Sequence, residues 1–184
     1  MVNAHDVAAA IIERQHAADR TIDKMQLQKL LYLVQGAHIE LWSEPAFRDG
    51  FQAYPRGPVV AGVEKTYRDA FGHGWEPIPN PVGGHPERLE ARTVEIVSMV
   101  LDRFGSRSAV TLEALTKADG SPWSVARGDL AADASSQAVL DPAAIERWFG
   151  AHGIDESAEL SAESRELFNR AANGDQDALA AFMQ

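Results

Sequence analysis

The sequence contains no cysteine, and this absence removes several classes of protein from consideration. A chain without thiols has no disulfide, no cysteine nucleophile and no cysteine zinc site. Its composition fits a reducing compartment, and we expect the protein to act in the cytoplasm. The sequence also lacks an apolar run of the ~20 residues that a membrane span needs, and its first residues lack the basic and apolar regions of a signal peptide. We therefore expect no membrane partner.

Basic residues are scarce: 17 Lys and Arg stand against 27 Asp and Glu, and the net charge is −10. The imbalance is uneven, because residues 129–184 hold eleven acids and three arginines, whereas the first 128 residues hold sixteen acids and fourteen bases. No basic stripe typical of nucleic-acid binding is visible, so we expect no direct nucleic-acid partner. The acidic region repels phosphate and suits a basic protein partner.

The sequence shows no motif of a known enzyme chemistry. There is no G-x-x-x-x-G-K-[ST] phosphate loop and no G-x-G-x-x-G. The six histidines include no H-E-x-x-H and no pair at i,i+4. We therefore expect no enzyme, no cofactor, no metal site and no catalytic residue. His38 lies on an apolar helix face and is interpreted as a core histidine, with a role as ligand or base as the alternative.

With 45% hydrophobic residues, the 184-residue chain can build one domain with a real core. Its best-specified helix runs from Asp23 to Trp42. Asp23 is placed to be the N-cap, and Gln26 completes a capping box. Apolar residues recur at helical spacing and predict one buried face: Leu27, Leu30, Leu31, Val34, Ala37, His38 and Leu41.

A second stripe of the same helix carries Gln28, Lys29, Tyr32 and Gln35, with Gly36 beside it. A solvated helix face usually carries Glu, Lys and Arg, and glycine in a helix interior costs roughly 1 kcal/mol against alanine. Two interpretations remain open at this point. The stripe is either a binding surface or an ordinary polar face, with the glycine where another helix crosses closely.

The other predicted elements follow from caps, turns and periodicity. Helices are expected at residues 3–18, 58–71, 86–104, 108–117 and 143–149, the second of them with Gly57 as N-cap and Pro58 at N1. Ser121-Pro122-Trp123 predicts the start of a further helix of one or two turns, and Asp141-Pro142 gives the helix at 143–149 the same cap-then-proline start. Asp49-Gly50 signals a turn before a short strand at 51–54. The fold class is therefore mainly α, with about seven helices and a small β-ribbon near residues 46–55. We expect one globular domain over residues 1–153 and an acidic helical extension over residues 154–184.

The extension predicts two short helices, capped by Ser161 and Asp175 and separated by Asn173-Gly174. Helices with so few turns and so little apolar surface are marginal alone. One hypothesis is that the extension docks weakly on the domain and completes its folding on a basic partner surface, where it helps to set which partner is recognised. The alternative is a solvated extension that folds back and does nothing else.

Four stretches carry a resemblance to a known family. KMQLQKLLYLVQGAHIELW, FQAYPRGPVV, EALTKADGSPW and IERWFG follow one another in the order and spacing of the Panacea domain, the SocA-like antitoxin family. The resemblance covers about residues 5–150. Met25-Gln26 departs mildly from the family's pattern, and residues 154–184 lie outside it, so nothing is carried over to them.

The resemblance implies an antitoxin of a toxin–antitoxin system, active in phage defence, that neutralises a cognate toxin by direct binding. The partner-binding residues expected from the matched motifs are Gln28, Lys29, Tyr32, Gln35, Tyr54, Arg56, Gly57, Pro58 and Trp123. One alternative is a proteolytic adaptor that delivers its client to an ATP-dependent protease, which would then be a second partner. Another is a small-ligand or nucleotide-binding protein that uses Tyr32, His38 and Arg56. A homo-oligomer is also left open.

Two of these residues have structural explanations as well. Arg56 suits a carboxylate or phosphate group, or else a structural salt bridge or a stack on Tyr54 or Trp42. Trp123 follows a proline at a short helix start, where a tryptophan commonly closes the edge of a core.

Overall fold

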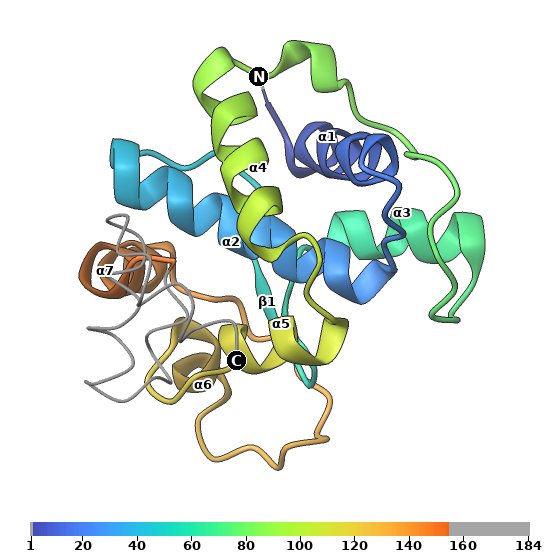
Figure 1. The fold of residues 1–184 in the computed structure, drawn as a ribbon. Helices are drawn as coiled ribbons and strands as arrows, with labels where there is room; N and C mark the ends of the chain where they lie inside the picture. Colours follow the sequence, from blue (N-terminus) through green and yellow to red (C-terminus); the bar gives the residue numbers. More distant parts are fainter. Residues whose placement is uncertain (1, 155–184) are drawn as a thin grey trace, which may run out of the picture. The chain divides into compact units, whose positions relative to one another are not determined.

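Helix α2 (Lys24–Trp42) lies at the centre of the fold in the computed structural model, which describes residues 2–154 (Figure 1). The predicted capping box is present: Gln26 N donates to Asp23 Oδ1 at 2.8 Å, and Asp23 N donates to Gln26 Oε1 at 3.0 Å. Neighbouring elements cover α2 so fully that residues 27–38 are all buried. A helix buried on every side is an interior helix rather than an amphipathic surface helix.

Six further α-helices surround α2 within residues 2–154. They are α1 (Ala4–Ala17), α3 (Ala61–Phe71), α4 (Ala91–Phe104), α5 (Ala109–Thr116), α6 (Pro122–Arg127) and α7 (Pro142–His152). Helix α2 packs against α1, α3, α4, α5 and α7, and Figure 1 shows α4 crossing it. Seven α-helices and one small sheet within the described residues confirm the mainly α fold class. Ser121 and Asp141 cap α6 and α7 as predicted, and Ser108 caps α5.

The small sheet is a hairpin of two antiparallel strands, β1 (Gln52–Tyr54) and β2 (Gly57–Val59), with Tyr54 opposite Gly57. The prediction of a helix starting at Gly57 and Pro58 is therefore wrong, because these residues form β2 and α3 begins only at Ala61. Gly57 has φ +103°, which suits a tight turn and not a helix cap. Pro58 is tolerated because a two-stranded sheet has only edge strands. The ribbon thus reaches residue 59, beyond the predicted range.

Two other predictions need correction. The expected helix over residues 86–104 is divided into a 3-10 turn, η1 (Pro86–Arg88), and α4, which begins only at Ala91. Leu41 was placed on the buried face of α2 but is 54% exposed. Periodicity gives the direction in which a side chain points, but it cannot tell where the covering elements end.

None of the helices in the described part of the chain is long and apolar enough to cross a membrane. The predicted boundary after residue 153 stays a prediction. The two helices predicted for the C-terminal extension lie outside the described residues.

Candidate functional site

The polar stripe of α2 is buried against the chain itself. Gln28 and Gln35 each use one side-chain amide to pair with the backbone of a loop. Gln28 Oε1 accepts from Val60 N at 2.8 Å, and Gln28 Nε2 donates to Val60 O at 3.4 Å. Gln35 Oε1 accepts from Ala46 N at 3.0 Å and from Phe47 N at 3.3 Å. Both glutamines therefore hold backbone groups that water cannot reach.

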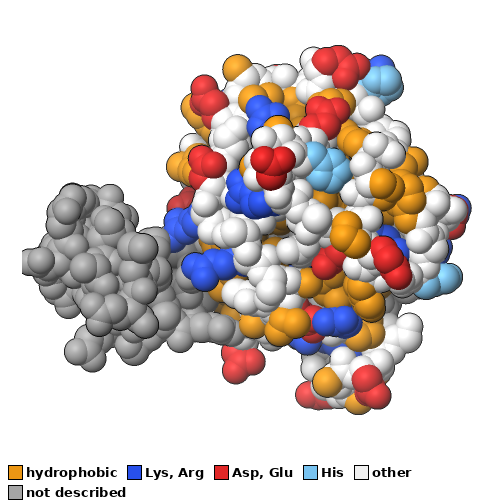
Figure 2. All heavy atoms as spheres, turned by 45° about the vertical axis from the view of Figure 1, so that its right-hand side comes forward, with side chains coloured by type: hydrophobic (Ala, Val, Ile, Leu, Met, Phe, Trp, Pro, Cys, Tyr) orange, Lys and Arg blue, Asp and Glu red, His pale blue; other side chains and the backbone are white. Residues whose placement is uncertain are grey.

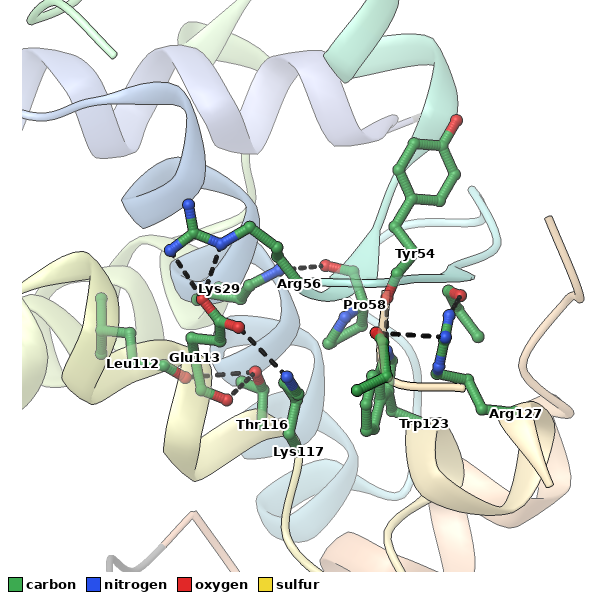
Figure 3. A network of polar contacts seen from close by, with 12 residues as sticks. Lys29, Tyr54, Arg56, Pro58, Leu112, Glu113, Thr116, Lys117, Trp123 and Arg127 are labelled. Carbon is green, nitrogen blue, oxygen red and sulfur yellow. Dashed lines mark hydrogen bonds and ion pairs between the residues drawn. The ribbon is translucent and has the colours of Figure 1, made fainter. Parts of the chain in front are cut away.

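Lys29 has its amine inside the protein, with 1% of the residue exposed. Its Nζ donates to the Pro58 carbonyl at 3.0 Å, which ties α2 to the hairpin (Figure 3). Burial lowers the pKa of Lys29 to about 7, because an ammonium group loses its hydration inside the protein. The negative charge of Glu113 opposes this lowering, whereas the positive charges of Arg56 and Lys117 add to it. A strongly perturbed lysine beside a surface turn is a candidate for function.

The turn of the hairpin carries an ion-pair network that reaches α5. Arg56 Nε donates to Glu113 Oε2 at 2.9 Å, and Lys117 Nζ donates to Glu113 Oε1 at 3.1 Å (Figure 3). Burial opposes ionisation of Glu113, but the hydrogen bonds from Lys117 and Arg56 outweigh it and lower the pKa of this carboxyl. The Arg56 guanidinium also lies 5.1 Å above the Trp75 ring. Arg56 thus makes a salt bridge, as one interpretation held, and its aromatic neighbour is Trp75.

Trp123 fastens the other side of the hairpin. Its Nε1 donates to the Tyr54 carbonyl at 2.7 Å, and only 8% of the residue is exposed. The Tyr54 ring points away from this network (Figure 3). Trp123 therefore closes the edge of the core, as the structural interpretation of the sequence proposed.

Arg127 completes the attachment and was missed by the sequence analysis. This residue is 5% exposed, and its guanidinium donates to the carbonyls of Ala53 at 3.2 Å, Ala131 at 2.6 Å and Ala134 at 3.0 Å. An arginine in the last turn of a short helix usually lies at the surface. Nothing in the local sequence indicates that a loop folds back over it.

A groove opens beside the hairpin turn, with a volume of about 220 Å³. Four segments line it: the start of α2, the hairpin, α3 and the chain after α3. The lining residues are Lys24, Met25, Gln28, Lys29, Tyr54, Pro55, Arg56, Val59, Glu64, Arg68, Gly72, His73 and Trp75. We call it the hairpin groove. Four of the predicted site residues line it: Gln28, Lys29, Tyr54 and Arg56.

The structure brings most of the predicted site residues to the hairpin, but not all of them. Gln28, Lys29, Tyr54, Arg56, Gly57, Pro58 and Trp123 lie in it or against it. Tyr32 instead packs between Phe51 and Phe149, with ring centroids 5.1 and 5.2 Å away, and Gln35 lies at the loop of residues 46–47. Of the nine, only Arg56 is exposed and only Tyr54 is half-buried. Their contact with a partner stays a prediction.

His38 is the core histidine of the first interpretation. Its Nδ1 donates to the Glu44 carbonyl at 2.7 Å, so Nε2 accepts from the Thr93 hydroxyl at 3.3 Å. Among residues 2–154 there is no group of three His, Asp or Glu side chains that could hold a metal ion.

Comparison with known proteins finds a matching family model and a similar curated protein. A family model described as "Antitoxin SocA-like, Panacea domain" matches residues 27–124, a span that contains most of α2, the hairpin, α3, α4, α5 and the start of α6. A relative named "Antitoxin SocA", from Caulobacter vibrioides (strain NA1000 / CB15N), is 31% identical over 134 residues, which cover 67% of this chain and 70% of the relative. No solved structure matches the chain.

Proposed function

The chain belongs to the SocA-like antitoxin family with the Panacea domain, and from this membership we propose that it neutralises a cognate toxin by binding the toxin protein directly. The proposal assigns it a binding role without catalysis or cofactor. We place this role in the cytoplasm and in defence against phage.

The observation that carries the proposal is the exposed Arg56–Trp75 pair within the matched span. Trp75 is 56% exposed, and the Arg56 side chain is 49% exposed. Tryptophan, tyrosine and arginine are the residue types that contribute most to protein–protein binding energy. Here Tyr54 and Arg56 stand on a hairpin whose backbone is held by hydrogen bonds from Lys29, Trp123 and Arg127. Trp75 comes from the chain after α3 and lies against Arg56. A rigid surface binds with a smaller loss of conformational entropy than a flexible one.

The distribution of charge supports a protein partner rather than a nucleic acid. On the face drawn in Figure 2, Lys and Arg side chains are interspersed with Asp and Glu, and hydrophobic side chains are exposed between them. Binding to a phosphate backbone relies on clustered Lys and Arg, whereas a mixed surface suits the polar rim and apolar centre of a protein interface.

The test is co-expression with the product of the adjacent gene. We expect that this product alone arrests growth and that co-expression of the antitoxin restores it. We also expect that, when one of the two proteins carries an affinity tag, the untagged protein co-purifies with it in an equal amount. If growth is restored but the purified proteins do not bind one another, direct neutralisation is overturned. A plaque assay with and without the gene pair tests the role against phage.

The adaptor alternative gives a different result in the same strains. An adaptor lowers the amount of toxin only while its ATP-dependent protease is present, so rescue would disappear in a strain without that protease. Neutralisation by binding leaves the toxin present, at unchanged amounts, and rescue then persists in both strains.

A further inference from the structure

The hairpin groove has an apolar interior that is open at the surface. Met25, Val59 and Pro55 contribute apolar side chains to it, and Tyr54 and the half-exposed Trp75 stand at its edge. A groove of about 220 Å³ is large enough to accept one or two apolar side chains, but it does not enclose a complete folded element. Its size therefore fits a short segment of a partner.

The charges around the groove are mostly positive, which contrasts with the chain as a whole. Lys24, Arg56 and Arg68 line it, together with Lys29 and His73, whereas Glu64 is the acidic lining residue. Arg68 pairs with Glu64 at 2.6 Å and Arg56 pairs with Glu113 at 2.9 Å, whereas Lys24 donates to a backbone carbonyl, that of Gly72. The whole chain carries a net charge of −10. A positive rim on a negatively charged protein attracts negative charge locally, because interactions at contact distance outweigh the screened charge of the distant surface.

Lys29 adds a donor to the lining of this groove. Its amine has three N–H donors, and one of them bonds to Pro58 O. Glu113, Arg56 and Lys117 are the charged groups that act on its pKa. A carboxylate that entered the groove would supply a further acceptor, and its negative charge would favour the protonated form of this buried amine.

We infer that the hairpin groove receives a segment of the toxin that combines an apolar side chain with neighbouring carboxylates. This inference rests on the proposed function, since it names the part of the toxin that the antitoxin recognises. The apolar side chain fills the space between Tyr54, Met25 and Trp75. The carboxylates face Lys24 on the rim and the Lys29 amine in the lining of the groove.

Two substitutions test the groove without disturbing the core. Trp75→Ala removes the exposed aromatic edge, and we expect the affinity for the toxin to fall about tenfold or more, mainly through faster dissociation. Lys24→Glu reverses a rim charge at the first position of α2, where a carboxylate is favourable for the helix. We expect it to lower the association rate constant and to flatten the dependence of that rate on salt.

Each variant has a matched control. Trp42→Ala removes a second tryptophan that is 49% exposed and that also lies under an arginine, Arg92 at 5.9 Å. Arg147→Glu reverses an exposed charge on α7, away from the groove. We expect both controls to bind the toxin with wild-type rates. Thermal unfolding of all four variants checks that each is folded.

The outcomes separate the inference from the function on which it rests. Wild-type rates for both groove variants, with wild-type binding intact, overturn the groove and keep the antitoxin. If the free antitoxin is a dimer by light scattering and a groove variant is a monomer, the groove binds a second copy of this chain. That result also overturns the inference. If the wild-type protein does not bind the toxin at all, the proposed function fails and the inference fails with it.

Discussion

The Phe149 ring of α7 lies so close to Gly36 of α2 that a Cβ atom placed on Gly36 would be 2.3 Å from Phe149 Cε1. Real Cβ atoms do not approach other atoms this closely, so the two helices can cross here only because residue 36 has no side chain. This confirms the interpretation that another helix crosses closely at Gly36. It also explains why a glycine is kept inside the central helix.

Gly36→Ala should destabilise the protein, although alanine is the better helix former by roughly 1 kcal/mol. Forcing a methyl group into a packed contact costs about 1–3 kcal/mol, so we expect a net loss in urea unfolding. Gly150→Ala is the matched control, because Gly150 lies in α7 with no atom of the described residues near its absent Cβ; it should gain up to about 1 kcal/mol. Equal gains for both variants would contradict the close crossing, and Phe149→Leu should relieve the loss at Gly36.

Leu31→Ala should cost ~2–5 kcal/mol of unfolding free energy, because Leu31 is fully buried in the core around α2. Leu41→Ala on the same helix is the control. Since Leu41 is 54% exposed, its truncation should change stability by less than about 0.5 kcal/mol. If chemical denaturation shows a loss below about 1 kcal/mol for Leu31→Ala, the buried, central position of α2 is contradicted.

Gln35→Leu should destabilise the protein, even though leucine is apolar and similar in size. The change leaves Ala46 N and Phe47 N without the oxygen that accepts from them, and a buried group without a partner costs about 1–3 kcal/mol. The exposed Gln137→Leu serves as control and should be nearly neutral. If Gln35→Leu is as stable as the control, the amide does not hold this loop.

Tyr32→Phe should leave stability unchanged or raise it. Among the residues that the structure describes, the buried Tyr32 hydroxyl has no hydrogen-bond partner, and burial raises the pKa of Tyr32. Tyr67→Phe is a matched control with the opposite expectation, because Tyr67 Oη accepts from Val82 N at 3.0 Å; it should lose about 1 kcal/mol. Equal losses in both variants, measured by thermal unfolding, would indicate that Tyr32 has a partner.

Lys29 should make the folded protein more stable as the pH rises from 7 towards 10. Its pKa is about 7 in the folded protein and near 10.5 in the unfolded chain. Between these values the unfolded chain binds a proton that the folded protein does not, so the unfolding free energy increases with pH, by up to about 1.4 kcal/mol per unit. The Lys29→Met variant has no amine at this position and therefore lacks this pH-dependent contribution to the unfolding free energy.

The measurement is the difference in unfolding free energy between wild type and Lys29→Met at pH 7 and at pH 9. Other titrating groups are common to both proteins and cancel in this difference. We expect the wild type to gain on the order of 2 kcal/mol relative to the variant over this range. A constant difference would mean that the Lys29 amine keeps its ordinary pKa in the folded protein.

Local sequence determined where most helices begin. Asp23 and Gln26 form the capping box of α2 with each other's backbone N–H groups. Ser108, Ser121 and Asp141 each accept a hydrogen bond from a backbone N–H group in the first turn of their helices. Such signals act within three or four residues, so a sequence read alone contains them. The family motifs were also visible, because they are runs of adjacent residues.

Tertiary structure decided what the polar residues do. Gln28, Lys29 and Gln35 all lie on α2, but their partners Val60, Pro58 and Ala46 come from segments 11–32 residues away. The strand at Gly57–Val59 also depends on contacts between segments that are distant in sequence. The same holds for the hydrogen bonds from Arg127 to Ala53 and to the loop after α6. The rim of the hairpin groove likewise combines four separate segments. Sequence periodicity states which way a side chain points, whereas only the packed fold determines whether solvent, a partner or the chain's own backbone meets it.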